Sequence, residues 1–164
     1  MKPVIRKLLF GGEGAATVLA DVGLTILRLG TGLGISLGHG LGKVWGPEGF
    51  GPSPQFIAGV QRLGFPLPTA FAWMAALTEF ACGLLLAAGL LTRPAALFLS
   101  INMAVAAFVA HADAPLFMTG QGPAKEPALL YLLPFVFFIF AGGGWFSVDH
   151  LLAGAGRTSR RIHV

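Results

Sequence analysis

Four long apolar stretches limit how this chain can fold. They cover residues 18–45, 69–91, 95–110 and 128–145. About 20 apolar residues are needed for a helix to cross the hydrocarbon core of a bilayer, so we interpret all four as transmembrane spans. Only 11% of the residues are charged and 55% are hydrophobic, which leaves few polar side chains to cover a water-soluble fold. We therefore predict an all-α integral membrane protein, with residues 1–164 forming a single domain, a four-transmembrane-helix bundle.

The placement of Lys and Arg predicts the orientation of this bundle. Four spans put both termini on one side of the membrane, together with the turn that holds Arg93. That side carries seven basic residues, most of them in tails 1–13 and 154–164, whereas the other side carries only Lys43, Arg62 and Lys125. Basic loops stay in the cytoplasm, so both termini are predicted to be cytoplasmic. The scattered positive charge does not resemble a nucleic-acid-binding surface, and no such partner is expected.

The first outer loop has helix signals of its own. Ser53 is suited to cap a helix, Pro54 is suited to its first position, and Gly64 is suited to end it. We predict a short amphipathic helix over residues 54–63 that lies in the membrane interface. Ser147 is suited to cap a second short helix after the fourth span, and residues 113–127 are expected to form a loop.

The first span carries polar residues at helical spacing. At 100° per residue they fall within roughly an 80° arc, which is one face of a helix. Lipid is an unfavourable neighbour for such a face, so we expect it to point into the bundle. The residues of this polar stripe are Asp21, Thr25, Arg28, Gly32, Ser36, His39 and Lys43. A second face carries Gly30, Gly34, Gly38 and Gly42, a spacing that favours close helix packing.

Glu79 is the ionisable residue of the second span, and a buried carboxylate needs a partner. His39 lies six residues from Trp45, and Glu79 lies six residues from Trp73. If both tryptophans mark the outer interface, the two residues lie at the same depth, about 9 Å below it. We therefore predict that Glu79 pairs with His39 or with Lys43. The pairing is either structural or part of a proton-handling or ligand-binding site.

Other polar residues in the spans are weaker candidates. Ser36 and Arg28 on the stripe, Asn102 in the third span and Tyr131 in the fourth are predicted to support this site. His111 lies about 180° from Asn102 on an ideal helix, so we do not expect both in one site. The sequence indicates no metal site. A single cysteine, Cys82, excludes a disulfide within the chain.

Three motifs resemble those of the DoxX family of small four-span bacterial membrane proteins, and the resemblance runs from about Leu27 to Leu152. The motifs are H-G-x-x-K in the first span, E-F-x-x-G-L-L-L-x-x-G-L-x-T-R in the second, and S-x-D near the end. They correspond here to His39 and Lys43, then Glu79, Gly83, Gly89 and Arg93, then Ser147 and Asp149.

The resemblance implies a location in the bacterial inner membrane, but it leaves the activity open. The family takes its name from a subunit of a thiosulfate:quinone oxidoreductase. Some members are linked to membrane-associated thiol and oxidative-stress assemblies, and distant animal relatives are assembly chaperones. A membrane-associated redox enzyme and a second copy of the chain are therefore the partners to consider, beside the lipid bilayer.

Two functions fit these observations. In the first, the protein is a redox-associated accessory subunit that handles quinone or protons, with His39, Lys43 and Glu79 as the polar groups around a quinone head group. The sequence has no haem, flavin or dithiol motif, so it is not expected to be a complete oxidoreductase. In the second, it is a non-enzymatic protein that binds a lipid or small hydrophobic ligand, or that assists the assembly of a partner membrane protein.

Overall fold

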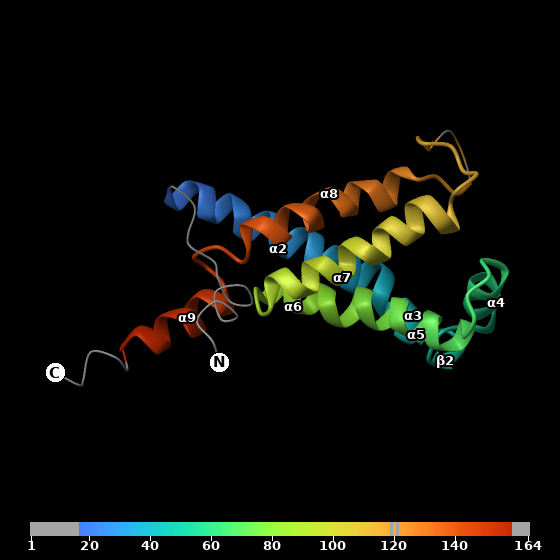
Figure 1. The fold of residues 1–164 in the computed structure, drawn as a ribbon, viewed down its shortest axis with the longest axis horizontal. Coiled ribbons are helices and arrows are strands. Elements are labelled where there is room, and N and C mark those ends of the chain that lie inside the picture. The colour runs from blue at the N-terminus through green and yellow to red at the C-terminus, as the bar shows by residue number, and fades with distance from the viewer. Residues whose placement is uncertain (1–16, 119, 121, 159–164) are drawn as a thin grey trace.

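The computed structural model of the protein describes residues 17–118, 120 and 122–158 and is mostly helical. Its helices run along one another through the middle of the molecule (Figure 1). The helix α4 (Pro54–Arg62) and a small hairpin lie at one end, which we call the pocket end. The helix α9 (Val148–Thr158) lies at the opposite end, which we call the terminal end. Tail 1–13 and residues 159–164 lie outside the described residues.

Three helices are long and apolar enough to cross a membrane. The first, Val18–Val44, consists of α2 (Val18–Ile35), a π-helical turn η1 (Ser36–Gly40) and α3 (Leu41–Val44). The second, Pro68–Ala88, consists of α5 (Pro68–Leu77), a π turn η2 (Thr78–Cys82) and α6 (Gly83–Ala88). The third, Thr92–Ala110, consists of α7 (Thr92–Val105) and a π turn η3 (Ala106–Ala110). These helices confirm the first three apolar stretches as helical, and the protein has several membrane-compatible helices.

The fourth stretch forms the shorter helix α8 (Glu126–Ala141), which packs along α7. It ends at Gly142, whose φ of 73° is accessible to glycine and stops the helix. The prediction of a helix up to residue 145 is therefore wrong by four residues. With 16 residues, α8 is shorter than the other three helices, and a fourth membrane crossing stays a prediction.

Two predicted caps are present. The Ser53 hydroxyl accepts a hydrogen bond from the Phe56 N–H at the start of α4, and the Ser147 hydroxyl accepts one from the His150 N–H at the start of α9. Strands β1 (Trp45–Gly46) and β2 (Gly49–Phe50) form a two-stranded antiparallel hairpin between the first long helix and α4. The helix predicted at 54–63 is thus present as α4, while its position in the membrane interface stays a prediction.

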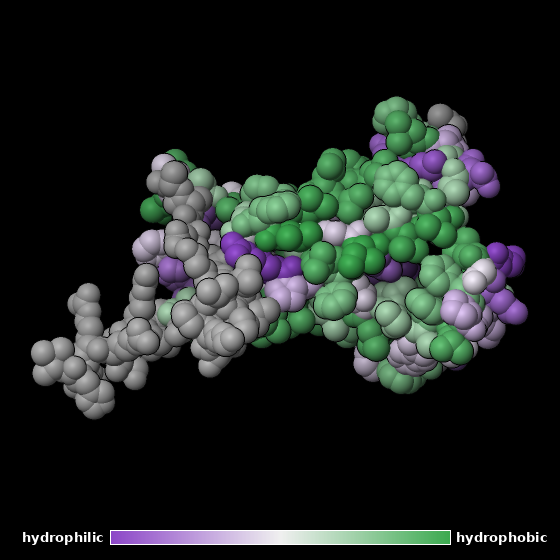
Figure 2. Space-filling view, in the orientation of Figure 1, coloured by the Kyte–Doolittle hydropathy of each residue, from purple (hydrophilic) through white to green (hydrophobic). Residues whose placement is uncertain are grey.

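Apolar side chains cover the middle of the molecule on its outside. Figure 2 shows them over much of this face, with hydrophilic residues gathered at the pocket end and a second hydrophilic group toward the other end, beside the atoms drawn in grey. Many large hydrophobic side chains are exposed, including Leu133, Phe140 and Ile26. The core itself is small and includes Leu86, Leu99, Phe135 and Phe138. An apolar outer surface of this extent suits a protein that is surrounded by lipid.

The helices pack most closely through glycines other than those predicted. A Cβ added at Gly32 would lie 2.7 Å from the Ala87 nitrogen, and one at Gly40 would collide with the Phe80 nitrogen. Added at Gly30, Gly38 or Gly42, a Cβ would meet nothing within 4 Å. The predicted glycine ridge is therefore wrong, apart from Gly34, which lies against the Tyr131 hydroxyl. The polar stripe occupies the face of the first helix that points into the bundle. The predicted glycines lie two residues before or after the residues of that face, so they point in other directions.

Candidate functional site

The polar stripe of the first helix is buried along most of its length, and then its register changes. Asp21, Arg28, Gly32 and Ser36 are buried, as predicted, and Thr25 is half-buried. The π turn that begins at Ser36 adds about one residue to a turn, so the inward positions beyond it are Gly40 and Val44. As a result His39 is exposed and Lys43 is half-buried. The predicted stripe therefore ends at Ser36.

Ser36 and Arg28 serve helix packing rather than the predicted site. The Ser36 hydroxyl donates a hydrogen bond to the Phe80 carbonyl at 2.9 Å. The Arg28 guanidinium, which is 2% exposed, donates from Nη1 to the carbonyls of Leu86 and Ala87 and from Nη2 to that of Phe146. Arg28 thus binds the carboxyl end of α6, where the helix dipole favours a positive charge.

Asp149 completes this arrangement from the start of α9. Its two carboxylate oxygens accept hydrogen bonds from the Leu91 N–H at 2.8 Å and the Thr92 N–H at 2.9 Å, which caps the first turn of α7. Asp149 also interacts electrostatically with Arg28. A Cβ at Gly89 would collide with Arg28 Nη1, and the φ of Gly89 is 70°, so only glycine fits beside the guanidinium. We call Arg28, Gly89, Thr92 and Asp149 the terminal clamp.

Glu79 is the centre of a second polar group, near the pocket end. Lys43 Nζ lies 2.5 Å from Glu79 Oε1 and 2.7 Å from Oε2. Asn102 Nδ2 donates to Oε1 at 3.0 Å. The Glu79 side chain is 4% exposed, whereas that of Lys43 is 30% exposed. Of the two partners predicted for Glu79, Lys43 is therefore the one that binds it, and the network joins the three long helices.

This network borders a cavity of about 260 Å³, which we call the polar pocket. Its polar side chains include four of the predicted site residues, His39, Lys43, Glu79 and Tyr131. The His39 and Tyr131 rings are in edge contact, with centroids 5.7 Å apart. Its apolar wall is formed by Ile35, Met103, Ala106 and Ala128, and segment 118–127 contributes further residues to its lining.

All three π turns contribute to the surroundings of this pocket. His39 lies in η1, Glu79 lies in η2, and Ala106 lies in η3. The turns η1 and η2 also contact each other. A π turn is less favourable than regular α-helix and occurs often at functional sites, because it redirects the side chains beyond it. Three such turns around one cavity single out the polar pocket as the candidate functional site.

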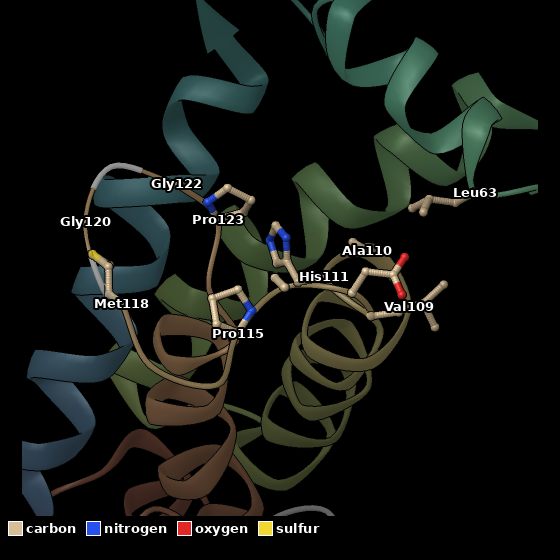
Figure 3. Close-up of a pocket in the computed structure, with 12 residues that line it drawn as sticks. Leu63, Val109, Ala110, His111, Pro115, Met118, Gly120, Gly122 and Pro123 are labelled. Carbon is tan, nitrogen blue, oxygen red and sulfur yellow. The ribbon is translucent and has the colours of Figure 1, made fainter.

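A larger cavity of about 690 Å³ lies beside the polar pocket and is called the loop cavity here. Figure 3 shows His111 in the middle of its lining, between Met118 and Pro123 on one side and Leu63 on the other. His111 also lines the polar pocket. We did not expect His111 and Asn102 in one site, and Asn102 does not line this pocket, although it donates a hydrogen bond to Glu79, which does. The π turn η3 stands between the two residues, so the ideal spacing of 100° per residue does not hold.

Comparison with known proteins agrees with this architecture. The model of the DoxX family matches residues 23–112, which is more than half of the chain and includes Lys43, Glu79, Asn102 and His111. The chain belongs to the DoxX family. An uncharacterized membrane protein of Mycobacterium tuberculosis is 33% identical over 135 residues, which cover 77% of this chain and 79% of that protein. An uncharacterized protein of Haemophilus influenzae is 39% identical over 84 residues, covering 47% of this chain and 58% of that protein. No solved structure matches the chain.

In this DoxX protein the three motifs divide between the two polar groups. His39, Lys43 and Glu79 lie at the polar pocket, whereas Gly89 and Asp149 belong to the terminal clamp. Asn102 reaches the pocket only through its hydrogen bond to Glu79. Reasoning from the sequence missed His111 as a lining residue. Its position just before a Pro- and Gly-rich loop was the available signal, because such loops can fold back over a helix end.

Proposed function

We propose that this DoxX protein is a redox-associated accessory subunit that binds a quinone head group in the polar pocket. It acts beside a membrane-associated redox enzyme, in the bacterial inner membrane, with four spans and both termini in the cytoplasm. The observation that carries the proposal is the pocket itself, in which hydrogen-bonding and ionisable side chains meet an apolar wall at three π turns. The same lining suits a ligand with a polar head on an apolar body.

The side chains present fit a quinone. Among residues 17–118, 120 and 122–158, neither the His39 ring nor the Tyr131 hydroxyl has a hydrogen-bond partner, so both are free to donate to a quinone carbonyl. Lys43 Nζ has three protons and two carboxylate contacts with Glu79, which leaves it able to donate to a ligand. Ile35, Met103 and Ala128 offer an apolar surface for the ring.

Each polar residue has a separate role in this proposal. When bound, a quinone supplies electron transfer that is coupled to proton uptake or release. Tyr131 and His39 orient the head group, and His39 lies on an exposed flank, where a lipid-soluble molecule arrives from the side. Glu79 exchanges a proton with the pocket, and Lys43 and Asn102 hold its carboxylate in place. The Phe56 ring of α4 lies 5.1 Å from Lys43 Nζ and covers that cation.

The direct test is the quinone content of the purified protein. Wild type, Glu79→Gln and His39→Ala are purified in mild detergent, and extracted lipids are measured by mass spectrometry. We expect bound quinone in the wild type and at least a tenfold loss in both variants, because His39→Ala removes a polar contact to the head group and Glu79→Gln removes the carboxylate that holds Lys43 beside it. Glu48→Gln and His150→Ala are matched controls, because neither residue lines either cavity.

Equal quinone content in wild type, Glu79→Gln and His39→Ala would contradict the proposal. So would the absence of quinone from wild type that is purified from cells rich in quinone. In intact cells, we expect deletion of the gene to cause a growth defect under oxidative or thiol stress. A deletion strain without that defect would argue against the redox role.

One observation favours the second function, that of a non-enzymatic binding or assembly protein. Lys43 and Asn102 already satisfy both oxygens of Glu79, so the network also acts as a structural joint between three helices. In that case the extracted lipid is a phospholipid or another hydrophobic molecule rather than a quinone. The same mass spectra distinguish the two functions.

A further inference from the structure

His111 stands between the two cavities at the pocket end. The polar pocket and the loop cavity share four lining residues, His111, Met118, Gly122 and Pro123. Of these only His111 is ionisable. The remaining ionisable side chains of the pocket, His39, Lys43, Glu79 and Tyr131, do not line the loop cavity, where Asp113 is the other ionisable group. The wall between the cavities therefore contains one side chain that can carry a charge.

The loop cavity has the character of an aqueous space. It lies at the end of the molecule where hydrophilic residues gather, rather than at the apolar middle (Figure 2). Its lining consists largely of a loop, and most of those loop residues are exposed, Asp113 among them. In Figure 3 the imidazole of His111 projects among these residues, not into the helix core. Water and small ions therefore reach His111 from this side.

We propose that the loop cavity is the aqueous entrance to the polar pocket. Water-soluble species, protons included, pass His111 at the junction of the two cavities before they reach Glu79 and Lys43, and we call this residue the threshold. This inference rests on the proposed function only in treating the polar pocket as the working site. A lipid-soluble ligand enters at the His39 flank, whereas protons and ions enter past His111. The pocket thus has two separate entrances, one toward lipid and one toward water.

The other charged or titratable groups around His111 are few. They come from its own loop, from the first and second long helices and from α8. Among the described residues that line the two cavities they are Asp113, His39, Lys43, Glu79 and Tyr131, and the Glu126 carboxylate also lies at their edge, where it accepts a hydrogen bond from the Met118 N–H. His39 is the other imidazole among them, and imidazoles are the side chains that ordinarily change charge between about pH 8 and pH 5. The experiment must therefore distinguish the effect of His39 from that of His111.

Cysteine labelling tests the entrance without any knowledge of the ligand. Cys82 is the only cysteine, so Cys82→Ala provides a clean background. Into it we introduce Ala106→Cys, at a half-buried position that lines the polar pocket but not the loop cavity. Full-length protein in phosphatidylcholine nanodiscs is treated with an anionic and a cationic methanethiosulfonate, sulfonatoethyl and trimethylammonium-ethyl. Ala107→Cys, at a buried position outside both cavities, is the unreactive control.

The measured quantity is the ratio of the anionic to the cationic labelling rate. Protonation of the new thiol slows both reagents alike, so it cancels in the ratio. We expect the ratio for Ala106→Cys to rise roughly fivefold from pH 8 to pH 5, as His111 gains a positive charge near the path. The rise is lost in His111→Gln and retained in His39→Gln. If Ala106→Cys does not fold, Ala124→Cys replaces it, because it lines the same pocket.

Two results would overturn the inference. If neither reagent labels Ala106→Cys or Ala124→Cys, the pocket has no aqueous entrance. If labelling occurs but its pH dependence survives in His111→Gln, His111 is not the threshold. Quinone content is measured on the same His111→Gln sample. Normal quinone binding with a lost pH dependence supports both proposals, and absence of quinone from wild type contradicts the proposed function alone.

Discussion

The terminal clamp and the polar pocket solve the same problem in different ways. Both contain ionisable side chains in apolar segments, where unpaired charge is costly. In the clamp, Arg28 and Asp149 bind backbone carbonyls and N–H groups at helix ends, and both are almost fully buried. In the pocket, Glu79 is held by side chains alone and borders a cavity. Charge that is satisfied by the backbone stabilises the fold, whereas charge beside a cavity remains open to a ligand.

The largest effect is expected from Arg28→Leu in the clamp. This variant leaves the carbonyls of Leu86, Ala87 and Phe146 without their donor and removes the positive charge near Asp149. Loss of one partner of a buried charge pair costs about 3–5 kcal/mol, so we expect poor expression or a strongly lowered Tm. Fluorescence-detected gel filtration after heating measures it. Arg62→Leu, at an exposed position, is the control. Equal Tm values for the two variants would contradict the claim that the terminal clamp stabilises the fold.

Asp149→Ala tests the same clamp from its other side, with a smaller effect. The Leu91 and Thr92 N–H groups lose their acceptor at the start of α7. Loss of a helix cap costs about 0.5–2 kcal/mol, and the weakened environment of Arg28 adds to it. We expect a Tm between those of Arg28→Leu and wild type. Asp113→Ala, an exposed aspartate beside the loop cavity, is expected to match wild type.

A pair of glycine variants in the same π turn tests the packing beside the pocket. Gly40→Ala places a Cβ against the Phe80 backbone, and overpacking of this kind costs about 1–3 kcal/mol. Gly38→Ala meets nothing within 4 Å, and in a helical segment the exchange is expected to stabilise by about 0.5–1 kcal/mol. Thermal unfolding measures both. A lower Tm for Gly38→Ala than for Gly40→Ala would contradict the observed register of η1.

The first helix also shows which features of the fold and of the candidate site can be predicted from the sequence. Apolar length predicted the three long helices, and local cap chemistry predicted the starts of α4 and α9 through Ser53 and Ser147. The match in depth is between His39 and Glu79, and of the two predicted partners, His39 and Lys43, it is Lys43 that binds the carboxylate. These predictions depend on length, on neighbouring residues or on depth, and a small change in helix twist does not affect them.

Apart from the end of α8, which Gly142 sets, the predictions that failed depend on strict helical periodicity. His39 lies off the inward face because the π turn η1 contains it. His111 lines the pocket because the π turn η3 directly precedes it and changes its direction. Arg28 was assigned to the wrong group because it shares a helix face with Ser36 but lies two turns farther along. Its partners are backbone carbonyls of α6 and Phe146, and carbonyls leave no mark in a sequence. Neither a π turn nor a tertiary carbonyl contact has a pattern that one sequence reveals.

The smallest loss of stability is expected from Glu79→Gln in the pocket. The glutamine side chain keeps an oxygen that accepts from Lys43 or Asn102, and the cavity lets water reach the changed group. We expect a loss of about 1 kcal/mol, well below that of Arg28→Leu. Thermal unfolding under the same conditions measures it. A loss as large as that of Arg28→Leu would make the pocket a second structural clamp.

The most direct test of the difference between the two regions is stabilisation by a ligand. A short-chain quinone is added to wild type and to Glu79→Gln, and Tm is measured against quinone concentration. A ligand that binds only the folded protein stabilises it by about 2.7 kcal/mol at 100 times its Kd. We predict a Tm that rises with quinone in wild type and in Glu48→Gln, and a flat response in Glu79→Gln. An equal rise in wild type and Glu79→Gln, or no rise in wild type, would contradict the assignment of the polar pocket as the binding site.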